Sequence, residues 1–146
     1  MDSLLMVLPD YRRAGVYQAQ IEPSEIVAAA KTAGLLVFQV NLGKASGKAS
    51  LLDALAQAFK FPTHFGRNWD ALNDILSDLS WVGGSGFVLL FLNADAFAAD
   101  NPAVFKAAVE VLQTVAKSWR EKRKPFWVLL EGSAEWKAHL PKLMLG

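Results

Sequence analysis

Three largely apolar runs, at 35–42, 87–92 and 126–130, alternate with stretches of mixed character. Each run is short, rich in branched and aromatic side chains, and bordered by glycine or proline. Runs of this length and composition favour strands over helices, and the lack of polar alternation favours strands buried on both faces. The pattern therefore predicts three buried strands.

The stretches between these runs carry apolar residues three and four positions apart, which is typical of amphipathic helices. Gly34 is well placed to stop the first helix, Asn68 is a suitable N-cap for the third, and Pro102 suits the start of a long fourth helix. The third helix should bury Trp69 and Leu72. We expect helices over residues 24–33, 51–59, 69–79 and 102–121.

This order of elements predicts an α/β fold, because buried strands separated by helices pair in parallel through crossover helices. The chain has 146 residues, the size of one domain, and no internal repeat or change of composition divides it. We therefore expect a single domain over residues 1–146 that contains a small parallel sheet.

The composition is that of a packed globular domain, since 53% of the residues are hydrophobic and 20% are charged. The absence of cysteine excludes disulfides, thiolate metal sites and cysteine nucleophiles. The chain starts with an acidic second residue and a short apolar run, so we expect no secretory leader. No apolar run approaches the length of a membrane span, and a cytoplasmic protein without membrane contact is the default expectation.

The net charge is only +1, but the charges are unevenly distributed. Asp70, Asp74 and Asp78 follow one another at four-residue intervals, which predicts a stripe on one face of the helix over 69–79. Arg67 is expected to pair with Asp70 or Asp74. Such a stripe is often only a solvated helix face.

The neighbours of the aspartates favour a binding surface over a plain solvated face. Aromatic and amide groups suit an interface, and several precede or begin the same helix. They are His64, Phe65, Gly66, Asn68 and Trp69. We expect this surface to bind a basic partner.

The same residues do not favour catalysis. Carboxylates one helical turn apart on an exposed face lack the buried pocket that tunes catalytic groups. His139 is the only other histidine, and the segment GKASGKAS lacks the spacing of a phosphate-binding loop. We expect no enzymatic activity, no metal and no cofactor.

A basic run at 117–124 encloses Trp119, and basic residues beside an aromatic ring can contact RNA or phosphate. The simpler interpretation is that cations gather at a helix C-terminus, where the helix dipole stabilises them. RNA binding is therefore the less favoured hypothesis.

The segment FPTHFGRNWDALNDIL, residues 61–76, resembles the central segment of the barstar family, the inhibitors of barnase-type ribonucleases. The shared pattern is a proline, an aromatic pair two residues later, and then Gly-x-Asn-x-Asp-Ala-Leu-x-Asp. The likeness covers about residues 35–130 and leaves 1–34 and 131–146 as extensions packed on that core. It implies a two-layer fold in which a three-stranded parallel sheet packs against helices.

The resemblance also implies which residues meet the partner, a basic ribonuclease of the extracellular type. Asp74 would fill the site that normally holds an RNA phosphate, and Asp70 would meet other basic and backbone donors. Gly66 would let the loop approach the enzyme closely, while Asn68 and Trp69 would lie at the start of the helix. The protein would then be a reversible inhibitor that occludes the ribonuclease site.

Four positions bear on the identity of that partner. His64 stands where the family commonly has a tyrosine, Asn73 replaces an aromatic contact residue, and Asp78 falls near a position that is usually small. Glu121 is the candidate for a further acidic contact late in the long helix. These departures favour a second hypothesis, in which the same fold is an immunity or interaction module for a different basic toxin or protein.

Overall fold

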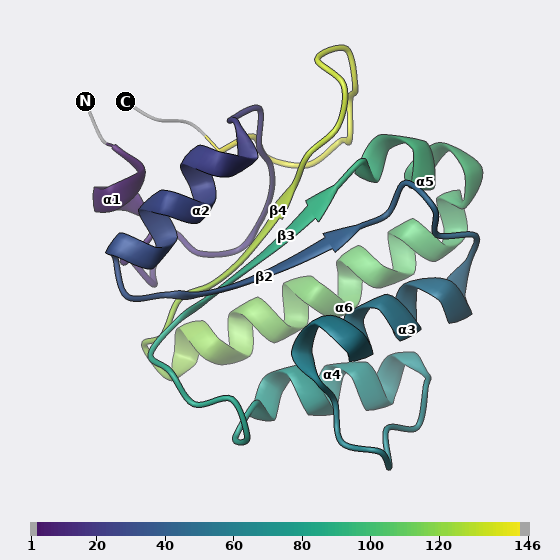
Figure 1. The fold of residues 1–146 in the computed structure, drawn as a ribbon, viewed down its shortest axis with the longest axis horizontal. Helices are drawn as coiled ribbons and strands as arrows, with labels where there is room; N and C mark the ends of the chain where they lie inside the picture. Colours follow the sequence, from purple (N-terminus) through teal and green to yellow (C-terminus); the bar gives the residue numbers. More distant parts are fainter. Residues whose placement is uncertain (1–2, 144–146) are drawn as a thin grey trace.

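The computed structural model describes residues 3–143, which form a parallel sheet of four strands in the order β1-β4-β3-β2, flanked by helices (Figure 1). The elements follow one another as α1 (Leu4–Val7), β1 (Val16–Gln18), α2 (Pro23–Thr32), β2 (Leu36–Asn41), α3 (Lys48–Phe59), α4 (Trp69–Asp78), β3 (Phe87–Leu92), α5 (Ala94–Asp100), α6 (Pro102–Glu121) and β4 (Phe126–Leu130). The α/β class and the parallel pairing expected from the sequence are confirmed.

The prediction of three strands is wrong, because β1 adds a fourth at the edge of the sheet. Its residues pair with β4, with Val16 opposite Val128 and Gln18 opposite Leu130. With only three residues, β1 shows no periodicity of its own. It is a strand because it pairs with β4, near the other end of the chain, so no local sequence pattern predicts it.

The predicted burial of the first apolar run is also wrong. β2 pairs only with β3 and forms the outer edge of the sheet, so of its six residues only Val40 is buried. Leu36 keeps 36% of its surface exposed. β3 and β4 lie inside the sheet and are almost fully buried, as expected. An apolar run therefore marked a strand correctly but could not tell a central position from an edge.

Helices cover both faces of the sheet, so the fold has three layers and not two (Figure 1). On one face, α3, α4, α5 and α6 pack over side chains such as Leu89 and Val128. On the other face, α1 and α2 pack over Val88, Leu90 and Trp127. The β1–β2 connection crosses the sheet in the opposite direction from the later connections, and right-handed crossovers then require opposite faces. The N-terminal residues supply this third layer.

The four expected helices are present, with α3 starting at Lys48 and α2 at Pro23, within a few residues of their predicted starts. The sequence pattern missed two short helices, α1 and α5. No helix within residues 3–143 is both long and apolar enough to cross a membrane.

Candidate functional site

The helix that carries the aspartates is held firmly on the long helix. Leu72 and Leu76 of α4 are fully buried. Trp119 of α6 donates its indole N–H to the carbonyl of Leu76 at 2.8 Å, and Lys122 donates to the carbonyl of Ser77 at 2.9 Å. These two bonds satisfy C-terminal carbonyls that α4 itself leaves unpaired. Side chains on the outer surface of α4 are thus presented from a fixed backbone.

The start of α4 is capped as predicted. The side-chain oxygen of Asn68 accepts from the main-chain N–H of Ala71 at 2.8 Å. A Cβ at Gly66 would lie 3.4 Å from the Cβ of Ala71, so glycine lets the loop pass close to the first turn. The bond from Ala71 to Asn68 fixes the end of the loop relative to the helix.

Arg67 does not pair with the aspartates of α4, contrary to expectation. Its guanidinium lies 2.9 Å from the carboxylate of Asp53 on α3, and this ion pair ties the loop to the preceding helix. Within residues 3–143, Asp70 and Asp74 form no ion pair. Their negative charge is therefore open to a partner.

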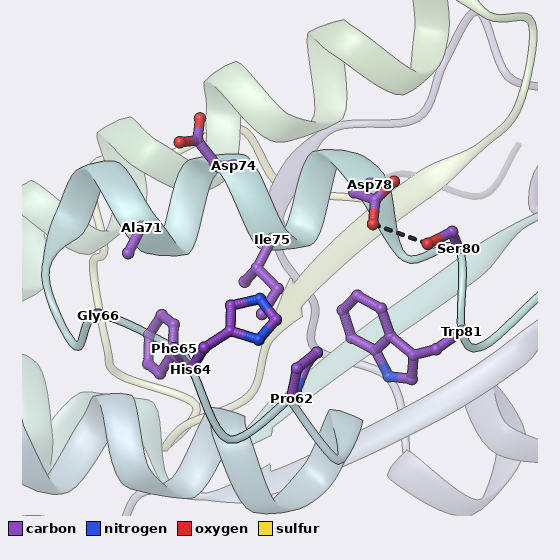
Figure 2. A pocket seen from close by; sticks show the side chains of 10 residues that line it. All are labelled: Pro62, His64, Phe65, Gly66, Ala71, Asp74, Ile75, Asp78, Ser80 and Trp81. Carbon is purple, nitrogen blue, oxygen red and sulfur yellow. Dashed lines mark hydrogen bonds between the residues drawn. The ribbon is translucent and has the colours of Figure 1, made fainter.

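A groove of about 480 Å³ separates the loop from α4. Figure 2 shows the rings of Phe65, His64 and Trp81 on the loop side of the groove and Asp74 and Asp78 on the helix, with the carboxylate of Asp74 pointing away from the rings. The groove is lined by Pro62, His64, Phe65, Gly66, Ala71, Asp74, Ile75, Asp78, Ser80 and Trp81. Apolar and aromatic groups form most of this surface, and the carboxylates stand along one rim.

Two hydrogen bonds shape the far end of the groove. Ser80 donates its hydroxyl to the carboxylate of Asp78 at 2.8 Å. The indole of Trp81 donates to the carbonyl of Phe59 at 3.0 Å, and its ring meets Phe61 edge-on. Trp81 is therefore held in place although its ring is exposed.

The three aspartates do not share one surface. Asp70 lies outside the groove, in a hollow of about 250 Å³ between α4 and α6 that Asn73 and Glu110 also line. A helix turns about 100° per residue, so each four-residue step drifts by about 40° and the two end aspartates point about 80° apart. The predicted stripe is thus divided between two hollows on either side of Asp74.

The hollow beside Asp70 is rich in acceptors. The side-chain oxygen of Asn73 is buried and has no hydrogen-bond partner among residues 3–143. The carboxylates of Asp70 and Glu110 lie at the same hollow. Trp69 is only half-buried there, not fully as predicted, and Lys48 lies 5.2 Å from its ring centre. This arrangement suits a donor-bearing side chain of a partner.

Sequence reasoning missed Trp81 and Glu110 and offered Glu121 as a candidate for a further acidic contact. Trp81 follows α4 in a glycine-rich turn, a setting that carries no signal for a binding role. Glu110 belongs to α6 and lies beside α4 only because of the way the two helices pack against each other. Glu121, the last residue of α6, lines neither hollow.

The observation that motivated RNA binding is weakened by the structure. Trp119 is only 5% exposed and is bonded to α4 through its indole N–H. Lys122 and Lys124 lie over its ring at 4.4 and 5.9 Å from the centre. A base cannot stack on a ring that is already covered, so the basic run offers cations without an aromatic platform.

Comparison with models of known protein families gives a match. A family model described as Barstar (barnase inhibitor) matches residues 35–131, well over half of the chain. No curated protein matches. The matched segment runs from β2 through β4 and includes the loop, α4 and both hollows. It leaves out α1, β1 and α2.

Proposed function

The chain belongs to the barstar family, and we propose that it is a reversible protein inhibitor of a barnase-type ribonuclease. In this proposal Asp74 enters the basic site that otherwise holds an RNA phosphate. His64, Gly66, Asn68, Trp69, Asp70, Asn73 and Asp78 complete the contact surface. Inhibition by occlusion requires no chemistry from the inhibitor.

The observation that carries the proposal is the unpaired carboxylate of Asp74 on a rigidly held helix. A ribonuclease site is basic because it must bind phosphates, and a carboxylate presented in a fixed position can replace one of them. Because Arg67 is occupied by Asp53, no cation of the loop competes for Asp74. The backbone of α4 is already ordered, so binding loses little conformational freedom.

The two hollows support the proposal by offering places for side chains on both sides of Asp74. The groove beside His64 and Trp81 combines apolar surface with carboxylates, which suits the stem and head of an arginine or lysine. The hollow beside Asp70 and Asn73 offers acceptors to a second donor. A basic protein can use both at once.

The test is inhibition of RNA cleavage by a purified barnase-type ribonuclease, measured while the protein is titrated into the enzyme. We expect cleavage to stop near a one-to-one ratio, and Asp74→Asn to weaken inhibition strongly. Asp100→Asn is the matched control, because Asp100 is exposed at the end of α5 and lines neither hollow. Absence of inhibition by the wild type at micromolar concentration would refute the proposal.

A different basic protein, such as an unrelated toxin, is the second candidate. His64 and Asn73 replace aromatic residues of the family pattern, and the resulting surface is more polar. Partners are captured from the native cell with the wild type and with the Asp70→Asn and Asp74→Asn variants. The protein that the wild type captures and the variants do not identifies the partner and separates the two candidates. Recovery of a protein without ribonuclease activity would favour this second candidate.

A further inference from the structure

A further polar hollow, separate from the groove and from the hollow beside Asp70, lies where β1 begins and has a volume of about 240 Å³. Residues 12–17 form one wall, Gln113 and Arg120 of α6 form another, and Pro141 of the C-terminal segment closes it. Arg12 and Arg13 also line it, so three arginines from two distant segments meet at one small cavity. The proposed inhibitory surface does not include this cavity, and of the basic run at 117–124 only Arg120 lines it.

Arg120 is the central group of the hollow. One terminal nitrogen of its guanidinium donates to the carbonyl of Ala14 at 2.8 Å. Its Nε is buried and has no hydrogen-bond partner among residues 3–143. A buried donor without an acceptor has lost its hydrogen bonds to water and gained none in return, which costs free energy. A bound ligand or ion that accepts from the donor removes this cost.

Two of the three arginines of the hollow keep a positive charge that no carboxylate of the described residues pairs with. Arg12 and Arg120 form no ion pair within residues 3–143. The nearby carboxylate of Asp10 accepts from the main-chain N–H of Arg12 at 3.0 Å, not from its guanidinium. The cavity therefore keeps an excess of donors and of positive charge.

Two polar side chains, those of Arg120 and Tyr17, lie close to Gly15 at the floor of the cavity. A Cβ at Gly15 would lie 3.7 Å from the terminal nitrogen of Arg120 and 4.0 Å from the hydroxyl oxygen of Tyr17. Glycine at this position thus leaves room beside the guanidinium. The hydroxyl of Tyr17 donates to the carbonyl of Arg13, which fixes the ring against the same floor.

We propose that this hollow binds a phosphate-sized oxyanion. The planar fork of arginine matches phosphate oxygens in paired hydrogen bonds, and several arginines together favour a doubly charged anion. The volume falls below the range of about 300–1,000 Å³ that is usual for larger ligands, so only the phosphate group itself is enclosed. The bound ion joins residues 12–17 to α6 and to the C-terminal segment.

The site is independent of the inhibitory surface although both use α6. Trp119 faces α4, whereas the next residue, Arg120, faces β1. Occupation of the hollow stabilises the folded state, since an ion that binds only the folded protein raises its unfolding temperature. The hollow combines Gln113 and Arg120 of the matched family segment with residues 12–17 and Pro141 outside it.

The test compares inorganic phosphate, adenosine monophosphate and chloride at equal ionic strength, by thermal unfolding and by amide chemical shifts. We expect both phosphate compounds to raise the unfolding temperature and to shift the amides of Gly15 and Gln113, while chloride does neither. A response to inorganic phosphate alone identifies the free ion, and a stronger response to the nucleotide identifies a phosphate monoester.

Arg12→Gln and Arg120→Gln should each weaken phosphate binding by about tenfold or more. Lys106→Gln is the control, since Lys106 is an exposed cation of α6 outside the hollow. Arg12 is exposed and makes no side-chain hydrogen bond among the described residues, so its variant tests the site even if Arg120→Gln unfolds. Equal responses to phosphate and chloride, or wild-type affinity in Arg12→Gln and Lys106→Gln alike, would overturn the proposal.

Discussion

The acidic groove beside α4 and the arginine hollow beside β1 lie on the two sides of α6 and carry opposite charge. The groove draws all its residues from one stretch, 62–81, whereas the hollow combines residues 12–17, α6 and Pro141. The net charge of +1 sums 15 basic and 14 acidic residues over the whole chain, and it describes neither surface. Local charge, and not the total, therefore decides which partner meets which side.

The largest expected effect comes from reversing charge in the groove. Asp74→Lys combined with Asp78→Lys should slow association with a barnase-type ribonuclease by about 100-fold at low salt, because attraction becomes repulsion. Arg12→Glu, which reverses one charge of the hollow, should change the rate by less than about threefold. Stopped-flow measurements at two salt concentrations test this, and a rate for Arg12→Glu raised well beyond about threefold would mean that total charge governs association.

The second prediction contrasts the two edge strands of the sheet. Gln18 of β1 is 2% exposed, donates to the carbonyl of Trp136 at 2.7 Å and accepts from the N–H of Ala138 at 3.2 Å. Gln18→Leu removes both bonds and should cost about 2 kcal/mol in the free energy of unfolding. Gln39→Leu, on the exposed edge β2, should stay within about 0.5 kcal/mol.

Urea unfolding followed by tryptophan fluorescence gives both values. The same Gln18→Leu protein should also lose part of its response to phosphate, because the C-terminal segment that Gln18 holds supplies Pro141 to the hollow. Its acidic groove should be unaffected. Equal stability of the two leucine variants would show that the C-terminal segment is not anchored at Gln18.

The third prediction concerns the fixed end of the groove. Trp81→Phe keeps an aromatic ring but removes the hydrogen bond to the carbonyl of Phe59, so it should cost about 1 kcal/mol in the free energy of unfolding. Trp69→Phe is the control, because the indole N–H of Trp69 donates to no group within residues 3–143. Chemical unfolding of the pair should show the larger loss for Trp81, and the reverse order would contradict the assigned bond.

The smallest effect is expected at Asp95. The main-chain N–H of Ser133 donates to its carboxylate at 3.0 Å and lowers the pKa of Asp95 below 3.8, although burial acts in the opposite direction. A lowered pKa means that the ionised carboxylate stabilises the fold above its ordinary pKa and loses this effect as the pH falls through the folded value.

Asp95→Asn should therefore reduce the free energy of unfolding at about pH 7 by well under 1 kcal/mol, because the group is close to solvent. The difference from the wild type should vanish at an acidic pH below the folded-state pKa of Asp95, where both proteins carry a neutral side chain. Unfolding curves at the two pH values provide the measurement. A difference that persists at low pH would assign the effect to packing against Gly132 instead of to charge.

Local patterns in the sequence predicted the elements that depend on neighbouring residues. The apolar runs marked β2, β3 and β4, and Asn68 marked the start of α4 through a bond to Ala71, three residues away. The acidic groove was partly predictable for the same reason, since its residues follow closely along the chain. His64, Asp74 and Asp78 do meet around it.

Features that depend on distant contacts could not be predicted. Arg67 forms its ion pair with Asp53, fourteen residues earlier, and not with the aspartates of α4, which are nearer in the sequence. Glu110 joined Asp70 only because α4 lies along α6, and β1 became a strand only by pairing with β4. The composition and local patterns of the sequence do not predict these contacts, because each contact depends on how separate helices and strands pack.

The pairing of β1 with β4 also has a consequence for synthesis. The ribosome makes β1 first and its only strand neighbour last, and the bridge from Gln18 to Lys142 needs still later residues. Strands β2 and β3 and helices α3 and α4 emerge between them and can assemble beforehand. During translation β1 therefore stays unpaired while the core between β2 and β3 forms. β1 can join the sheet only after β4, the last strand, has left the exit tunnel of the ribosome.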